Sequence, residues 1–486
     1  MKIIFSLSIF LIFINTSLAN NCADHSASDP SVPLCPEGAG ILSEVYPVRM
    51  ATVSTEVDGG AVHAGSFVSQ LFASQPDKPP AVIISGKNTD CAWAKQIVAR
   101  RAPASKRALW VSNIQCNPES EWNWQQDFMQ GYVNSSGQPV VRFNPEYYNG
   151  EGRAVYKGLP ERIQKCGFET NEEGRGGTNP YMGGNIEGMP PDFCVIGDNV
   201  PEAERSFMCN GAKNIMVAPT GFMKVGHTDE IMKTVHTGGP PPCNFKVLVG
   251  SVDLAKELMA AAPQDEDFIP TPTDITSNVC GFETEANLSP GSGGSSTTTT
   301  QNFLLQYLMP QSAFADLRVE GPDGRRAPSR EVRDRRSGSE SSEQGSSEPL
   351  KTCTPQKFLR NLERSEEGSR NNEIGAKLDN FAEGVKKTMG SKLPQCGDVV
   401  ERVPMLFTAR QDDDAVSIFP NPTNGVNING TMIYSDPNNK IFDKYLTDLS
   451  RKIGVKKRTV NTAEPHRLNG NLHCSTNLLR YCRPRK

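Results

Sequence analysis

The fold and function assignments both depend on Gly470-Asn-Leu-His473-Cys474-Ser-Thr-Asn477, a stretch close to the end of the printed sequence. The chain contains 13 cysteines, so pairing them as disulfides leaves one thiol over. In an exported protein such a cysteine is an intermolecular link or a free reactive thiol. A buried, unpaired thiol without chemistry is the alternative. Because Cys474 directly follows a histidine, we take it as the candidate nucleophile.

The N-terminal residues 1–19 have the pattern of a secretory signal peptide. Lys2 precedes an apolar run over 3–14, and Ser17-Leu-Ala19 forms a small-residue cleavage site. The run is too short to cross a bilayer and no later run is longer, so we expect a secreted protein without membrane insertion. The cysteines should then form disulfides, and residues 20–45 read as an N-terminal arm held by a Cys22–Cys35 bridge.

Composition excludes some partners and predicts an insert. The net charge of −4 gives no attraction to nucleic acid or to an anionic membrane. Residues 287–350 contain a Ser/Gly/Thr run at 289–300, a basic stretch at 325–336 and a Ser/Glu-rich stretch at 337–347. Such segments cannot bury a core, so we expect a low-complexity insert within an otherwise ordered domain over 46–486.

Outside the insert, short apolar runs alternate with amphipathic ones. The pattern predicts strands at 81–85, 108–112, 140–143, 193–196, 215–218, 245–250 and 458–461. It predicts helices at 90–101 and 253–262, one beginning at Thr354-Pro355, one ending at Gly390, and one from Asp436-Pro437 to Gly454. These short units predict a mixed α/β or α+β fold instead of a doubly wound sheet.

Two further segments carry candidate chemical groups. Asp127 lies between aromatic residues in 122–132, where a carboxylate could hold a cation against an aromatic wall; a solvated surface acid is the alternative. In 226–230, His227 and Asp229 share one face if the segment is extended, although a structural histidine is equally compatible. Neighbouring side chains in an extended segment point to opposite sides. His473 should therefore point away from Cys474, and Glu230 away from Asp229, so we interpret both as supporting residues.

The sequence lacks the motifs of common metal sites, phosphate-binding loops and serine hydrolases. The sequence has neither a Cys-x-x-Cys pair nor a His-Glu-x-x-His helix, and the glycines at 174–177 are not followed by the Lys-Ser/Thr of a phosphate loop. It also has no Gly-x-Ser-x-Gly elbow. Cysteine nucleophilic catalysis without a required cofactor is what these exclusions leave.

Five blocks, taken in order, resemble the catalytic domain of the protein-arginine deiminases. They are Trp124-x-Gln126-Asp127, Gly184-Asn-Ile-Glu187, Val225-Gly-His227-x-Asp229-Glu230, Phe419-Pro-Asn421 and His473-Cys474-x-Thr476-Asn477. The resemblance covers roughly 46–486, interrupted by the insert. It implies the five-bladed α/β propeller of the guanidine-modifying (pentein) enzymes, built from ββαβ units, and conversion of peptidyl-arginine to peptidyl-citrulline.

The resemblance also implies a role for each residue. Cys474 would attack the guanidinium carbon through a covalent thiouronium intermediate, and His227 would move the protons. Asp127 and Asp229 would bind the guanidinium nitrogens, and Trp124 would line the side-chain tunnel. The chemistry agrees, because a planar guanidinium is best held by paired carboxylates.

The chain departs from the calcium-dependent members of that family. Phe128 and Gln130 stand where two calcium-binding glutamates are expected. This leaves Gln126 and Glu187, with backbone carbonyls of the 184–187 loop, as candidate ligands of one calcium ion. The family's Asp-Ser-Pro-Arg segment is replaced by 143–148, so the arginine that contacts the substrate backbone is missing. Free arginine, agmatine or another small guanidine compound therefore competes with protein or peptide substrates. The sequence is also compatible with a catalytically inactive binding protein on this fold and with an unrelated cysteine protease.

Overall fold

The structure is a computed structural model, and it describes residues 32–36, 39–56, 59–120, 124–144, 157–171, 183–263, 280, 353–409 and 414–484. All of these belong to one compact unit, formed by 1–282 and 352–486. The predicted signal peptide (1–19), the first part of the predicted arm and the predicted insert (287–350) lie outside the described residues.

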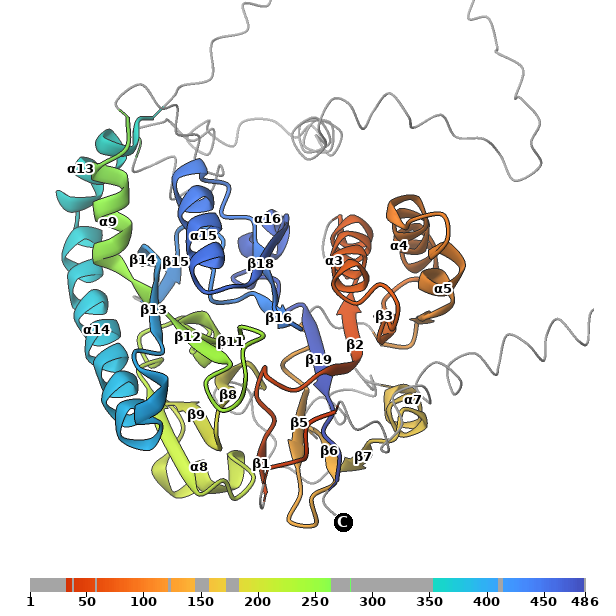
Figure 1. Cartoon of the computed structure of the whole chain (residues 1–486). Helices are drawn as coiled ribbons and strands as arrows, with labels where there is room; N and C mark the ends of the chain where they lie inside the picture. The colour runs from red at the N-terminus through yellow and green to blue at the C-terminus, as the bar shows by residue number, and fades with distance from the viewer. Residues whose placement is uncertain are drawn as a thin grey trace, which may run out of the picture. The chain divides into compact units, whose positions relative to one another are not determined.

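Five sheets in the described part of the chain repeat one topology (Figure 1). In each, a first strand pairs antiparallel with a second, which pairs parallel with a third. The five sets are β5 (Met129–Val133), β6 (Pro139–Phe143) and β7 (Glu169–Asn171); β8 (Ile186–Met189), β9 (Phe193–Gly197) and β10 (Asn214–Ala218); β11 (Met232–His236), β12 (Phe245–Ser251) and β13 (Val400–Pro404); β16 (Val426–Ile428), β17 (Thr431–Ser435) and β18 (Lys456–Val460); and β19 (Thr476–Arg480), β2 (Val48–Ser54) and β3 (Ala81–Ser85), with β4 (Ile114–Asn117) added beside β3.

Helices connect the parallel strands, because a parallel pair needs a long crossover while an antiparallel pair needs only a short turn. The helices are α3 (Gly60–Ser74), α4 (Asn88–Arg101), α5 (Arg107–Ser112), α7 (Leu159–Lys165), α8 (Glu202–Met208), α9 (Val252–Ala260), α13 (Pro355–Glu363), α14 (Glu366–Lys392), α15 (Lys440–Lys452) and α16 (Ala463–Arg467), with short 3-10 turns η1 (Gly183–Asn185), η2 (Thr228–Glu230) and η4 (Pro394–Cys396). Strand β1 (Gly40–Ile41) joins β5, and β14 (Phe407–Ala409) pairs with β15 (Ala415–Ser417). The prediction of a mixed α/β fold is confirmed.

The fifth sheet joins the two ends of the described chain. Strand β19 lies antiparallel to β2 in the register Thr476↔Val53, and β2 lies parallel to β3. Every residue of β2 and β3 is buried. Because β19 is fixed in this sheet, the loop that precedes it, with Cys474, is held at a defined place.

Helix α14 shows how the apolar pattern becomes packing. The predicted stripe Ile374, Leu378, Phe381, Val385 and Met389 is buried in the largest hydrophobic cluster. Burial of each such side chain stabilises the fold by roughly 1.5–3 kcal/mol. The helix continues two residues past the predicted end at Gly390, because a glycine alone does not stop a helix whose next turn is still hydrogen-bonded.

Three sequence predictions are wrong. Residues 108–112 lie in helix α5, not in a strand, because only Trp110 is buried in that run and a strand would bury alternate residues. Helix α15 begins at Lys440 instead of Asp436, because the Asn439 side chain accepts hydrogen bonds from the amides of Ile441 and Phe442.

The third is the Cys22–Cys35 bridge. Cys35 is bonded to Cys482, because backbone hydrogen bonds between residues 33–35 and Arg483 bring the two ends of the chain together. The other disulfides among the described residues are Cys91–Cys116, Cys194–Cys209, Cys243–Cys396 and Cys280–Cys353. These bridges indicate an oxidising compartment. None of the helices in the described ranges has the length and apolar character to cross a bilayer.

Candidate active site

Cys474 lies in the loop between α16 and β19, and its thiol is free and buried. Asn424 holds this loop from the segment before β16. Its Nδ2 donates to Cys474 Sγ at 3.1 Å, and its Oδ1 accepts from the amides of His473 at 3.0 Å and Cys474 at 3.3 Å. The amide of Gln126 donates to the Cys474 carbonyl at 3.2 Å, which joins this loop to the one that carries Asp127. The prediction of a leftover free thiol is confirmed.

Carboxylates determine the electrostatics at the thiol. Burial raises the pKa of Cys474 well above its usual value, and the charges of Asp229, Glu230 and Asp127 raise it further. All three carboxylates are themselves buried. A thiol in this setting stays protonated until positive charge enters the site, since a nearby cation favours the thiolate.

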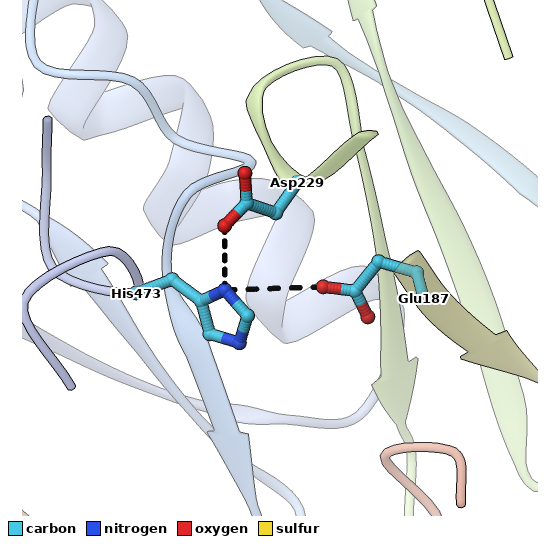
Figure 2. A group of neighbouring side chains, drawn as sticks. All are labelled: Glu187, Asp229 and His473. Carbon is cyan, nitrogen blue, oxygen red and sulfur yellow. Dashed lines mark hydrogen bonds and ion pairs between the residues drawn. The ribbon is translucent and has the colours of Figure 1, made fainter. Parts of the chain in front are cut away.

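Asp229 lies in the 3-10 turn η2, immediately before β11. Its Oδ2 accepts a hydrogen bond from His473 Nδ1 at 2.7 Å, as Figure 2 shows. Its other oxygen, Oδ1, is buried and accepts no hydrogen bond from the described residues. Burial raises the pKa of Asp229 to about 6, against the opposing effects of His227, Lys233 and the Asn424 amide. This carboxylate therefore keeps unused acceptor capacity inside the protein.

His227 precedes the same turn and is buried against the η1 loop. A Cβ atom on Gly184 would come within 2.5 Å of His227 Nδ1, so only glycine allows the loop to approach the ring this closely. Burial lowers the pKa of His227 to about 4, although Asp229 raises it. The imidazole is therefore neutral near pH 7 and can accept a proton. Residues 228–230 form a 3-10 turn and not the extended strand in which His227 and Asp229 would share one face.

Glu230 supports this turn. Its Oε2 accepts from the amide of His227 at 3.2 Å, and its carbonyl accepts from Asn421 Nδ2 at 2.6 Å. Burial, followed by the charge of Asp229, raises the pKa of Glu230 well above its usual value. The Phe419-Pro-Asn421 block thus fixes the backbone that carries His227 and Asp229.

Asp127 and Trp124 lie in the turn before β5. The Asp127 amide donates to the Trp124 carbonyl at 3.2 Å. A Cβ on Gly470 would come within 2.3 Å of the Trp124 ring, so the indole packs directly on the backbone of the cysteine loop. The first and last of the five sequence blocks are in contact through the hydrogen bond from the Gln126 amide to the Cys474 carbonyl.

Sequence reasoning missed a buried ionic network beside the site. Lys233, the second residue of β11, is fully buried, and its Nζ lies 3.0 Å from a carboxylate oxygen of Glu187 and 3.0 Å from one of Glu44. It also lies 2.9 Å from His473 Nε2. Glu44 is paired in addition with Arg480. One hint was visible in the sequence, where a lysine lies within the apolar run 231–235. A buried ammonium at such a position needs polar or charged partners.

His473 is held at both ring nitrogens. An ammonium only donates, so Nε2 accepts from Lys233 and the Nδ1 proton is donated to Asp229. Burial, together with the charge of Lys233, lowers the pKa of His473 to about 3. Figure 2 shows its Nδ1 facing the carboxylates of both Asp229 and Glu187, the latter at 3.9 Å. A supporting role, as predicted for His473, is consistent with these contacts.

The residues predicted to bind calcium do not form a fitting site. Calcium takes six to eight oxygen ligands, whereas Glu187 already accepts from the Lys233 ammonium at 3.0 Å. The Gln126 Oε1 atom is buried and has no partner, but one neutral oxygen does not offset the repulsion between Lys233 and a divalent ion. Glu187, Asp229 and His473 also place one ligand atom each within 4.8 Å of one another, and the same ammonium adjoins them.

Comparison with known proteins gives similarity in structure only. No family model and no curated protein sequence matches the chain. An agmatine deiminase from C. jejuni has a TM-score of 0.46 at 11% identity, covering 92% of this chain and 97% of that one. A putative peptidyl-arginine deiminase has a TM-score of 0.48 at 10% identity, covering 91% and 99%. A putative arginine deiminase from Porphyromonas gingivalis has a TM-score of 0.45 at 10% identity, covering 92% and 99%. We therefore base the function on the side chains of the site.

Proposed function

We propose that this chain is a secreted guanidine deiminase, which hydrolyses a guanidinium group to a ureido group and ammonia through a covalent bond to Cys474. The observation that carries the proposal is a free, buried thiol under the combined field of three buried carboxylates, Asp127, Asp229 and Glu230. Buried carboxylates of like charge repel one another unless a cation joins them. A guanidinium is the cation whose forked N–H groups match paired carboxylates and whose carbon a thiolate can attack.

Binding of the substrate would activate the nucleophile. The positive guanidinium offsets the negative charges that raise the pKa of Cys474, so the thiol can lose its proton in the complex. We assign that proton to the neutral imidazole of His227. Sγ then attacks the guanidinium carbon, the C–N bond to one terminal nitrogen breaks, and this nitrogen leaves as ammonia after accepting the proton from His227.

Water completes the turnover. His227, neutral again, accepts a proton from a water molecule, whose oxygen attacks the carbon of the S-alkyl thiouronium group. The C–S bond breaks as the remaining hydroxyl proton passes to solvent, and the ureido product leaves. The thiolate then takes the proton back from His227, which restores the neutral thiol and imidazole. Because the product is neutral, the three carboxylates attract it less than they attract the substrate.

His227 suits the proton-transfer role better than His473. Both ring nitrogens of His473 are engaged, one by Asp229 and one by Lys233, so neither is available to accept a proton from the thiol. Asp229 and Asp127 are the proposed guanidinium ligands, and the unpaired Oδ1 of Asp229 supports this assignment. Trp124, packed on Gly470, is the proposed wall of the substrate channel.

A small guanidine compound is the better substrate candidate than peptidyl-arginine. Cys474 is 4% exposed and Asp229 is fully buried, so a guanidinium must be inserted deeply to reach them. The arginine expected to hold a peptide backbone is missing from 143–148. Affinity for a protein substrate would have to come from other residues. Free arginine or agmatine needs only the buried carboxylates and a short channel.

The repeated sheets support the finer fold assignment. Five units with the order antiparallel, then parallel through a helical crossover, are the ββαβ units expected of a five-bladed α/β propeller. First strands of different sheets contact one another, β19 with β5, β8 with β11 and β11 with β16. We infer that these first strands surround the site.

Release of ammonia and of ureido product tests the function. The mature protein, with its disulfides formed, is incubated with agmatine, free arginine and a blocked peptidyl-arginine. We expect turnover of at least one guanidine substrate, and a loss of about four orders of magnitude or more in Cys474→Ala. Ser450→Ala, at a buried serine of helix α15 that is hydrogen-bonded to Tyr434, serves as the control that keeps activity.

The pattern over substrates separates the candidate functions. Turnover of agmatine or arginine without turnover of the peptide supports a small-guanidine deiminase, and the reverse result supports a protein-arginine deiminase. Turnover that persists in Cys474→Ala would contradict the proposed nucleophile. Absence of turnover with every guanidine, while guanidines still bind, would indicate an inactive binding protein.

A further inference from the structure

Lys233 is the most deeply buried cation near the site, and its surroundings resemble those of a bound metal ion. Among described residues, its side chain is fully buried in β11. Three acceptors surround Nζ: carboxylate oxygens of Glu44 and Glu187, each at 3.0 Å, and His473 Nε2 at 2.9 Å. An ammonium has three donors. Every N–H of Lys233 therefore has an acceptor, and these come from three separate parts of the chain.

The network is balanced in charge. Arg480 pairs with Glu44 and donates to the carbonyls of Tyr46 at 2.8 Å and Asn427 at 2.7 Å. Two cations, Lys233 and Arg480, thus match two carboxylates, Glu44 and Glu187. A buried ionic group is tolerated only when it is paired and hydrogen-bonded in this way.

A small polar pocket adjoins the network. Its lining includes Glu44, Glu187 and His473, which contact Lys233, and also Gln126. The Oε1 atom of Gln126 is buried and accepts no hydrogen bond within the described part of the chain. If the lysine side chain were shortened, the acceptors it now joins would border this pocket, with the Gln126 oxygen close by.

We propose that Lys233 is the resident cation of this position and takes the place of a divalent metal ion, so that truncating its side chain creates a metal site from Glu44, Glu187 and His473. Two carboxylates and one imidazole form a ligand set typical of Zn²⁺, with a further position for water or the Gln126 oxygen. Bonds from Zn²⁺ to such ligands are about 2.0–2.2 Å, so each acceptor moves inward by roughly 1 Å from its present distance to Nζ.

Direct measurement of metal binding tests the proposal. Lys233→Ala and wild-type protein are titrated with Zn²⁺ by calorimetry, and bound zinc is counted after desalting. We expect one zinc ion per Lys233→Ala chain and roughly 100-fold weaker binding to the wild type, the scale on which neighbouring groups alter metal affinity. Zinc should also raise the melting temperature of the variant, because a ligand that binds only the folded state stabilises it.

Lys233→Met is the matched control. It removes the same charge but keeps a chain of similar length, so the space stays filled and we expect no tight zinc binding. Equal binding by wild type, Lys233→Ala and Lys233→Met would overturn the proposal, as would the absence of binding to a folded Lys233→Ala. Should Lys233→Ala fold only with zinc present, that dependence supports the proposal. Failure to fold both with and without zinc also overturns it.

The proposal is independent of the reaction assigned to Cys474. Zinc binding and thermal stability are measured without any guanidine, so a wrong assignment of the reaction leaves both results interpretable. Conversely, if the Lys233→Ala variant does not bind zinc, the proposed deiminase function is unaffected and only the proposal for Lys233 is wrong.

Discussion

Two groups of buried charges lie side by side in this protein and are built in opposite ways. The group around Cys474 consists of Asp127, Asp229 and Glu230, whose charges raise the pKa of the thiol. The group around Lys233 pairs each carboxylate with a cation at close distance. His473 connects the two, because it bonds Asp229 through Nδ1 and Lys233 through Nε2.

This contrast indicates which of the two groups binds a ligand. The Lys233 group is satisfied by its own residues, so it can stabilise the site without a ligand. The Cys474 group holds excess negative charge within the fold, which is relieved when a carboxylate takes up a proton or when a cation arrives. Strongly perturbed pKa values in a group that its own residues do not neutralise are a physical sign of a binding or catalytic site.

Removal of a charge from the balanced group should have the largest effect on stability. Lys233→Met leaves Glu187 and Glu44 with one cation between them, and an uncompensated buried charge costs about 3–5 kcal/mol. We expect the free energy of unfolding to fall by that amount in urea titrations. Lys386→Met is the matched control, because its ion pair with Asp398 is 3.0 Å long and half exposed.

Exposed ion pairs contribute little to stability because water and salt screen them, so Lys386→Met should unfold close to the wild-type midpoint. Equal losses in the two lysine variants would show that the burial of the Lys233 group does not matter, and the contrast between the two charge groups would fail. Lys233→Arg should recover part of the stability, because it restores the charge with a different shape.

Removal of a charge from the unbalanced group should stabilise the fold, and the size of this effect should depend on pH. The pKa of Asp229 is raised from 3.8 to about 6 in the folded protein, so between these values the folded state binds a proton that the unfolded state has lost. Asp229 thus disfavours folding increasingly as pH rises from about 4 to about 6, by up to about 3 kcal/mol.

Asp229→Asn should lose this term. Relative to wild type, its free energy of unfolding should increase between about pH 4 and pH 7, after subtraction of a constant loss for the altered bond to His473. His227 and His473, whose pKa values are lowered, act in the opposite direction in both proteins. Because Asp229 raises the pKa of His227, the substitution lowers that pKa further, which adds to the expected increase with pH. Activity should fall about 10²–10³-fold or more, since a fixed group in the reaction site is lost. A pH-independent stability difference would contradict the raised pKa.

The fold class and much of the secondary structure could be predicted because they depend on local pattern. The apolar stripe of α14 and the apolar runs of β3, β9 and β12 can be recognised from residues that are close in the sequence. The disulfide between Cys35 and Cys482 spans 447 residues. It forms because the fold brings these distant segments together, and no local sequence pattern predicts that.

The site divides in the same way. Cys474, His227, Asp229 and Asp127 stood out through motif order, whereas Lys233, Glu44 and Arg480 did not. Each of these three is ordinary in its own segment, and its importance comes only from the partners that folding supplies. A lysine inside an apolar strand was the one visible hint, because burial of an unpaired ammonium would be too costly.

The smallest effect we expect is that of Asp127→Asn. Asp127 interacts with Glu230 and Cys474 through charge, and loss of one like charge at moderate distance should stabilise the ligand-free protein by about 1 kcal/mol. Guanidinium compounds should stabilise the wild type by about 2.7 kcal/mol at a hundred times their dissociation constant. Asp127→Asn should lose most of that gain, which thermal melts with and without agmatine would measure.

The two measurements on Asp127→Asn must change in opposite directions for the contrast to hold. A residue that merely supports the fold would lose stability on substitution and leave the ligand effect unchanged. A residue kept for a cation gains stability when the cation is absent and loses the response when it is present. Asp398→Asn, at a half-exposed pair with Lys386, should change neither by more than about 0.5–1 kcal/mol. If Asp127→Asn behaves like Asp398→Asn, the carboxylates around Cys474 are not a cation site.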